Sequence, residues 1–114
     1  VVCDDLNLFF GNIKLKPNGT SGGHNGLKDI EDNLGSSNYA RLRVGISNNN
    51  KIPKSDYVLG KWSSYELSNI NSLTISSIEI IFSFIQTGME ETMNLYNKKN
   101  FIKWKFSGVL KIII

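Results

Sequence analysis

The single histidine of the chain stands in a glycine-rich segment that could bind an anion. Gly22 and Gly23 precede the pair His24 and Asn25, and Gly26 follows it. Glycine lets a backbone approach a ligand closely, and a helix that begins here would favour negative charge at its N-terminus. The segment therefore suits a phosphate, a carboxylate or a developing oxyanion. The structural alternative is that the glycines only form turns and Asn25 only caps the helix.

Basic residues alternate with apolar ones in two other segments. Lys14 and Lys16 are separated by one apolar residue, as are Arg41 and Arg43. Side chains two residues apart lie on the same face of a strand, so each pair presents its charges together. Arginine can bind a phosphate through two parallel hydrogen bonds, and lysine binds it as a point charge. Residues of these types are therefore chemically suited to bind a phosphate, and the alternative is a solvated strand face.

The elements that position these residues can be predicted from hydrophobic periodicity and turn residues. Strand-like segments are expected at residues 1–3, 13–16, 41–46 and 57–60. The first is expected to be buried and to end at Asp4 and Asp5, whose carboxylates would face a cleft or solvent. A short helix is expected after the glycine-rich segment, with apolar residues at helical spacing and Gly35 as its C-terminal stop.

A longer helix is predicted from Ser63 onward, and its apolar residues recur every three or four positions. We expect this stripe to face the core: Ile75, Ile78, Phe82, Ile85, Met89, Met93 and Tyr96. Ile81 and Phe84 lie off the stripe, which leaves open a second covered side or a partner. Residues 101–106 alternate like a strand or an amphipathic tail, and residues 109–114 are apolar and edge-forming.

The composition limits the classes of protein. With 114 residues, 40% of them hydrophobic, and a formal net charge of +3, the chain fits one globular domain. The charge permits a nucleic-acid partner without requiring one. The single cysteine, Cys3, excludes an internal disulfide and fits a reducing compartment.

Motifs for metals, cofactors and membranes are not evident in the sequence. One histidine and scattered acids predict no metal site, and the absence of nucleotide-binding glycine motifs predicts no cofactor. No apolar run reaches the roughly 18 residues of a membrane span, and no leader pattern is visible, so a soluble protein is expected.

A series of segments in this order resembles the bacterial-type peptidyl-tRNA hydrolase family. The segments are residues 2–8, 14–16, 21–30 and 41–46, followed by Tyr-Val-Leu-Gly-Lys at residues 57–61. The likeness covers roughly residues 1–96, taken here as a partial domain of that family, and leaves residues 97–114 as a divergent tail. It implies an α/β fold, a single three-layer domain with a twisted mixed sheet flanked by helices, incomplete in this chain.

The resemblance also implies an activity and residue roles. Members of the family hydrolyse the ester between a peptide and tRNA, which recycles the tRNA. Asp4 matches the aspartate that orients the family's general-base histidine. His24 and Asn25 match a pair that positions substrate and contacts the attacking water or the oxyanion.

The same resemblance extends to the partner and its binding site. Lys16 and Arg43 match the basic pair that grips the tRNA 5′-phosphate, and Lys14 lies on the same strand face. The implied partner is peptidyl-tRNA, without a metal or a membrane. The complete protein is expected to be a monomer, in the cytoplasm or in a mitochondrion or plastid.

Departures from the family pattern weaken the expectation of activity. The N-terminal segment with the general-base histidine has no counterpart, so the chain alone should be a poor catalyst or none. Asn7 replaces a usual aspartate. The missing segment would also leave residues 1–3 and 44–46 without a neighbouring strand, so we expect exposed apolar surface and association.

Two other functions remain open at this point. One is a non-catalytic RNA-binding relative of the same fold, of the organellar splicing-factor type, although such a protein has no chemical need for Asp4, His24 and Asn25 together. The other is a small interaction domain whose glycine turn only starts a helix.

Overall fold

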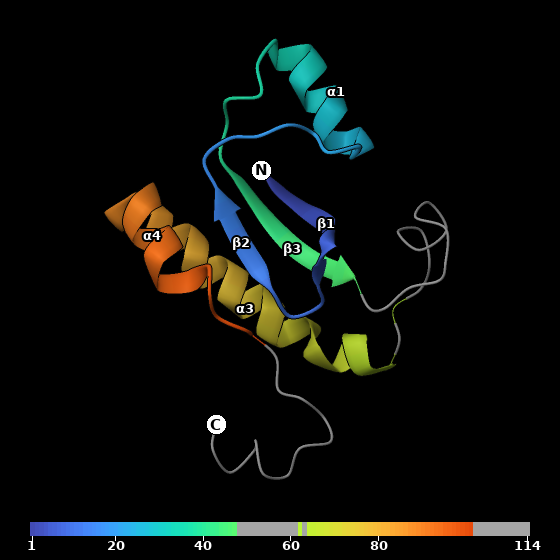
Figure 1. Ribbon diagram of the computed structural model, residues 1–114. Helices are drawn as coiled ribbons and strands as arrows, with labels where there is room; N and C mark the ends of the chain where they lie inside the picture. The colour runs from blue at the N-terminus through green and yellow to red at the C-terminus, as the bar shows by residue number, and fades with distance from the viewer. Residues whose placement is uncertain (48–61, 63, 102–114) are drawn as a thin grey trace.

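A three-stranded mixed sheet forms the centre of the computed structural model, which describes residues 1–47, 62 and 64–101. The elements are β1 (Val2–Phe9), β2 (Ile13–Lys16), α1 (Asn25–Leu34), β3 (Arg41–Ser47), α3 (Ser64–Thr87) and α4 (Met89–Tyr96). In space the strands follow the order β1-β3-β2, with β1 parallel and β2 antiparallel to β3. Helices α3 and α4 cover one face of the sheet, and α1 lies beyond the end where β1 and β3 begin (Figure 1). The α/β fold class is confirmed.

The strands differ from the expectations at β1 and at the sheet centre. β1 continues past the two acids to Phe9, so Asp4 and Asp5 lie within a strand, and Val1 and Val2 are exposed. The prediction of a short buried strand that ends at the acids is therefore wrong. The expectation that residues 44–46 lack a neighbour is also wrong, because β3 pairs on both sides. β2 has the predicted bounds, and β3 extends one residue further than predicted.

Gly45 allows β1 to cross closely over β3. The register between the two strands shifts between Asp5 and Phe9. A Cβ at Gly45 would lie 2.9 Å from both Cβ and the carbonyl oxygen of Leu8, and closer still to the carbonyl oxygen of Phe9. Only a residue without a side chain fits between these atoms. The glycine thus allows β1 to remain paired with β3 after Asp5, as far as Phe9.

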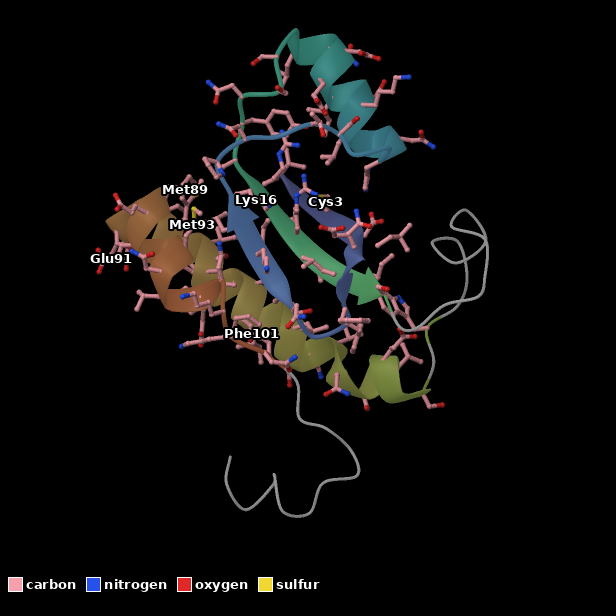
Figure 2. All side chains as sticks on the ribbon, in the orientation of Figure 1. Cys3, Lys16, Met89, Glu91, Met93 and Phe101 are labelled. Carbon is pink, nitrogen blue, oxygen red and sulfur yellow. The ribbon has the colours of Figure 1, made fainter. Side chains whose placement is uncertain are left out.

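The core lies between the sheet and the inner side of α3. Its buried members come from the strands, from α3 and, for Phe10, from the turn after β1: Phe10, Ile13, Leu15, Leu42, Leu73 and Ile80. Phe84, Met89, Met93 and Tyr96 pack against them and are partly buried. In Figure 2, Met89 and Met93 lie on α4 beside α3 and the sheet. Apolar residues of both helices therefore reach the core.

The predicted apolar stripe is right for α4 and wrong for α3. Ile75, Ile78, Phe82 and Ile85 are all exposed, whereas Leu73 and Ile80 face the sheet. Two physical reasons account for the difference. Apolar residues occupy more than one side of α3, and the chain turns at Gly88, with φ 92°, so α3 and α4 are separate helices with different inward faces.

Residues after α4 continue to pack on the sheet. The side chain of Asn97 donates to the carbonyl oxygen of Leu15 at 3.0 Å and accepts from its N–H at 2.8 Å. The N–H of Phe101 donates to the carbonyl oxygen of Gly11 at 2.9 Å. The segments predicted at residues 57–60 and 109–114, and all but the first residue of 101–106, lie outside the described residues. In the described part, no helix combines the length and apolarity needed to cross a membrane.

Candidate functional site

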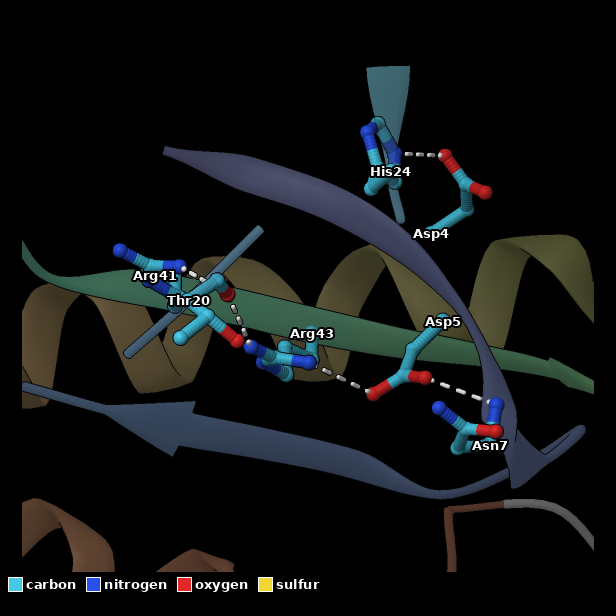
Figure 3. A network of polar contacts seen from close by, with 7 residues as sticks. All are labelled: Asp4, Asp5, Asn7, Thr20, His24, Arg41 and Arg43. Carbon is cyan, nitrogen blue, oxygen red and sulfur yellow. Dashed lines mark hydrogen bonds and ion pairs between the residues drawn. The ribbon is translucent and has the colours of Figure 1, made fainter. Parts of the chain in front are cut away.

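Asp4 and His24 meet at the end of the sheet below α1. The imidazole Nε2 of His24 lies 2.8 Å from Oδ1 of Asp4 (Figure 3). The two side chains are 27% and 37% exposed, so water can reach both. β1 supplies the carboxylate, and the turn before α1 supplies the imidazole. Two residues that the sequence analysis assigned to the same site are therefore in direct contact.

His24 also caps α1, and this fixes its tautomer. Its Nδ1 accepts a hydrogen bond of 3.1 Å from the N–H of Leu27, so Nδ1 carries no proton in this arrangement. Nε2 then holds the ring proton and donates it to Asp4. The cap residue is His24 and not Asn25, which is the first, exposed residue of the helix. Because both ring nitrogens are engaged, His24 is not placed to accept a proton from water.

A glycine next to His24 makes room for the ring. A Cβ at Gly26 would lie 3.0 Å from Cε1 and 3.3 Å from Nδ1 of His24. Those distances are shorter than ordinary carbon contacts. The glycine thus leaves space beside the first turn of α1 for the imidazole, whose Nδ1 accepts from the N–H of Leu27.

Asp5 has a different partner from its neighbour because consecutive strand residues point to opposite faces. Its Oδ2 accepts from Nη1 of Arg43 at 3.3 Å, and its Oδ1 accepts from the N–H of Asn7 at 2.8 Å. The side chains of Arg43 and Asp5 are only 17% and 9% exposed. Arg43, predicted to grip a tRNA phosphate, is thus already paired with a carboxylate inside this chain.

Four cations share one face of β2 and β3. In the antiparallel register Lys14 lies opposite Arg43, and Lys16 lies opposite Arg41. Directly opposite residues project on the same side of a sheet. Lys16 is exposed at the end of β2 (Figure 2). Lys14 and Arg43 are partly buried, and Arg41 is fully buried. The predicted sharing of a face within each pair is confirmed, and the register adds that both pairs lie on the same face. Lys16 is the most exposed of the four.

Asp5 and Arg41 are members of the cluster that had no predicted site role. The sequence shows only that Arg41 alternates with Arg43, whereas in the structure it donates to two backbone carbonyls beside α1. One signal for Asp5 was available in the sequence. Asp5 directly follows Asp4 in an extended segment, so the two carboxylates point to opposite faces and contact different partners.

Cys3 lies beside the site on β1, and its sulfur is buried. Burial raises the pKa of the thiol above its ordinary value, and the nearby Asp4 and Asp5 carboxylates raise the pKa further. Arg43 and Arg41 act in the opposite direction and lower it, without cancelling the effect of burial. Cys3 is therefore held as a neutral thiol. The described residues contain no group of three or more metal-ligating His, Cys, Asp or Glu side chains.

The fold and the site define an α/β domain with a carboxylate and histidine pair at the N-terminus of a helix. A row of cations on two adjacent strands accompanies the pair. These features belong to elements that are contiguous in sequence, from β1 to β3.

Comparison with known proteins identifies the family. The sequence profile described as peptidyl-tRNA hydrolase matches residues 1–103. The chain is 46% identical over 98 residues to the peptidyl-tRNA hydrolase of Porphyromonas gingivalis, covering 85% of this chain and 53% of that protein. Against the Geobacter metallireducens enzyme of the same name, the identity is 36% over 102 residues, covering 90% and 53%. The chain belongs to the peptidyl-tRNA hydrolase family.

A solved structure supports the same assignment. The peptidyl-tRNA hydrolase of Acinetobacter baumannii superposes with a TM-score of 0.76 at 33% identity, covering 89% of this chain and 52% of that one. The chain thus spans about half the length of the relatives that it matches.

Proposed function

We propose that this chain is part of an enzyme that hydrolyses the ester between a peptide and the 3′ end of tRNA. The observation that carries the proposal is the contact of 2.8 Å between Asp4 and His24 at the N-terminus of α1. Family membership supplies the reaction class. In support of the proposal, the carboxylate of Asp4 is held beside a helix N-terminus, and such an end favours the negative charge that develops in acyl transfer.

In the reaction, a water oxygen attacks the ester carbonyl carbon while a general base takes a proton from that water. The bond between the carbonyl carbon and the ribose oxygen then breaks, and the ribose oxygen receives a proton. His24 is not the base in this scheme, because Leu27 and Asp4 occupy its two ring nitrogens. The second histidine that the family resemblance implies would take that role.

Asp4 and Asn25 have separate parts in the proposed mechanism. Oδ1 of Asp4 is bound to His24, while Oδ2 accepts no hydrogen bond from the described residues and is available to orient the base. Asn25 is exposed at the first turn of α1 and would contact the attacking water or the oxyanion. The N-terminus of α1 adds favourable potential for the negative charge that develops in the transition state.

The tRNA phosphate would be bound by the face of β2 and β3 that carries the cations. Lys16 is exposed and would contact the phosphate directly. Lys14 and Arg43 lie behind it and would add positive potential, with Arg43 keeping its bond to Asp5. We expect the complete protein to be a monomer, in the cytoplasm or in an organelle.

The proposal is tested by hydrolysis of an N-acetyl-aminoacyl-tRNA. Two proteins are compared: this chain alone, and this chain joined to the N-terminal half of the Porphyromonas gingivalis relative. We expect activity only in the joined protein, because the general base is missing from the chain alone. Asp4→Ala in the joined protein should lower kcat by about 100-fold or more, the usual size of a positioned acid or base effect.

Asp29→Ala is the matched control, since it removes an exposed carboxylate from the same helix without touching His24. It should leave hydrolysis unchanged. A joined protein that binds tRNA without hydrolysing it would contradict the proposal and favour a non-catalytic RNA-binding protein. A joined protein with no preference for tRNA over other RNA would indicate an interaction domain.

A further inference from the structure

Arg41 is a fully buried cation with no carboxylate partner among the described residues. Its relative exposure is 0%, and its Nε atom donates to no acceptor in the described part. Burying a guanidinium is unfavourable unless hydrogen bonds and other contacts compensate for lost hydration. The burial of Arg41 is therefore not favourable by itself, and its contacts must explain why an arginine occupies this position.

The guanidinium of Arg41 connects the two chain segments that flank α1. Nη1 donates to the carbonyl oxygen of Thr20 at 3.0 Å, and Nη2 donates to that of Ser37 at 2.9 Å. Thr20 lies four residues before His24, and Ser37 lies two residues after Gly35, the C-cap of α1. The planar fork of arginine can hold two acceptors at fixed positions, which a lysine cannot.

A third contact links Arg41 to the helix itself. The guanidinium carbon lies 4.1 Å from the centre of the Tyr39 ring, a stacking distance for a cation on an aromatic face. The hydroxyl of Tyr39 donates to Oε2 of Glu31, in the last turns of α1, at 3.3 Å. Arg41 thereby contacts the start and the end of the segment 20–37 directly, and reaches the helix through Tyr39. At the start it is assisted by Nη2 of Arg43, which also donates to the carbonyl oxygen of Thr20, at 3.5 Å. Only Arg41 contacts both ends.

We infer that Arg41 is a positioning residue that sets the distance between His24 and Asp4. The sheet fixes Asp4, because β1 pairs with β3 and places Asp4 opposite Val44. Arg41, in the same β3, fixes the segment that carries His24. Figure 3 shows Asp4 on β1 and Arg41 on β3. This role differs from phosphate binding, for which a fully buried guanidinium offers no surface. It rests on the proposed function, since it concerns the same site.

The single histidine makes the inference directly measurable in this chain. The ¹⁵N chemical shifts of Nδ1 and Nε2 report which nitrogen carries the proton, and every imidazole signal belongs to His24. In the unchanged chain we expect an unprotonated Nδ1 and a protonated Nε2. In Arg41→Lys we expect both shifts to move toward the averaged values of a solvated imidazole, because a lysine cannot hold Thr20 and Ser37 together.

Leu42→Val is the control for general loss of stability. Leu42 is the next residue of β3, points to the opposite face and is buried in the core. This variant should lower the melting temperature while leaving the His24 shifts unchanged. Unchanged shifts in Arg41→Lys would overturn the inference, as would equal shift changes in both variants.

A second variant covers the case in which a buried lysine prevents folding. Arg41→Gln leaves no buried charge, and its amide can hold only one of the two carbonyls well. It should fold and show the same loss of the His24 signature. If neither variant folds, the inference is overturned, because Arg41 then supports the whole sheet. If His24 behaves as expected but the joined protein does not hydrolyse its substrate, the proposed function fails while the inference stands.

Discussion

The polar cluster between β1 and α1 differs from the outer face of α3 in how its groups are satisfied. In the cluster, Asp4 meets His24, Asp5 meets Arg43, and Arg41 meets two carbonyl oxygens. On α3, the apolar side chains that point away from the sheet are exposed: Leu67, Ile75, Ile78, Ile81, Phe82 and Ile85. Apart from the Nε atoms of Arg41 and Arg43, the polar groups of the cluster have partners within the described residues, and the apolar side chains on the outer face of α3 remain uncovered there.

The difference teaches which part of the molecule this chain specifies by itself. Hydrogen bonds in the cluster link β1, β3, α1 and the two segments that flank α1, so all of the partners named here lie between Asp4 and Arg43. A contiguous group of large exposed apolar side chains is uncommon on an isolated soluble domain and marks a surface that contacts another molecule or segment. The site residues can therefore be studied in this chain, whereas its solution behaviour depends on α3.

The largest expected effect is on association. We expect the chain to associate through the outer face of α3, since covering each large apolar side chain stabilises a contact by roughly 1.5 to 3 kcal/mol. Phe82→Glu places a charge in the middle of this face and should give a monomer. The measurement is the molar mass in solution across a range of concentrations.

Ser72→Glu is the matched control for this prediction, because it adds the same charge at an exposed position of α3 away from the apolar face. It should associate like the unchanged chain. A chain that is monomeric at every concentration and melts cooperatively would remove the contrast between the two regions.

The next largest effect separates the two adjacent aspartates. Asp5→Ala leaves Arg43 buried without its carboxylate and should lower the free energy of unfolding by about 3 kcal/mol. Asp4→Ala removes a more exposed partner of His24 and should cost about 1 kcal/mol or less. Urea unfolding of both variants measures the difference. Equal losses would mean that Asp4 is a structural residue and not a site residue.

The parts of the fold that were predictable share a clear local signal. Lys14 and Lys16 alternate with apolar residues between turn signals, which gave β2 its correct bounds. Gly35 ended α1 as predicted, with φ 70° in the left-handed region that glycine favours. In both cases, residues close in sequence determine the structure.

The inward face of α3 could not be predicted from its own sequence. Leu73, Ile80 and Phe84 face the sheet at helical spacing, but Ile78 and Phe82 follow the same spacing on another side. Hydrophobic periodicity predicts that α3 has an apolar face, but it does not predict which of two apolar faces packs on the sheet. That choice depends on contacts with strands distant in sequence.

Asp4 and His24 could be named as candidates from the sequence, but their contact could not be predicted. Asp4 and His24 were assigned through the family resemblance, yet nothing in the sequence indicated that they bind each other across 20 residues. The buried position of Arg41 was equally hidden, because alternation predicts which face a charged residue takes and not what covers it. The contacts arise only when the segment 20–37 folds back over β1 and β3.

The smallest expected effect concerns Cys3, which directly precedes the two acids on β1 and lies opposite Arg43 on β3. Burial raises the pKa of its thiol above the ordinary value of 9.0. A group with a raised pKa in the folded state stabilises the fold fully below its ordinary pKa, and that contribution is lost as pH rises through the folded value. Stability should therefore fall above about pH 9 in the unchanged chain, and less so in Cys3→Ala. Unfolding curves of both proteins at several pH values measure this difference.

A second measurement is the rate at which Cys3 is alkylated at neutral pH. Alkylation should be slow, because the thiolate is the nucleophile and Cys3 is held as a neutral thiol. Rapid alkylation in the folded chain would show that β1 opens, and the polar cluster would then be no better fixed than the outer face of α3.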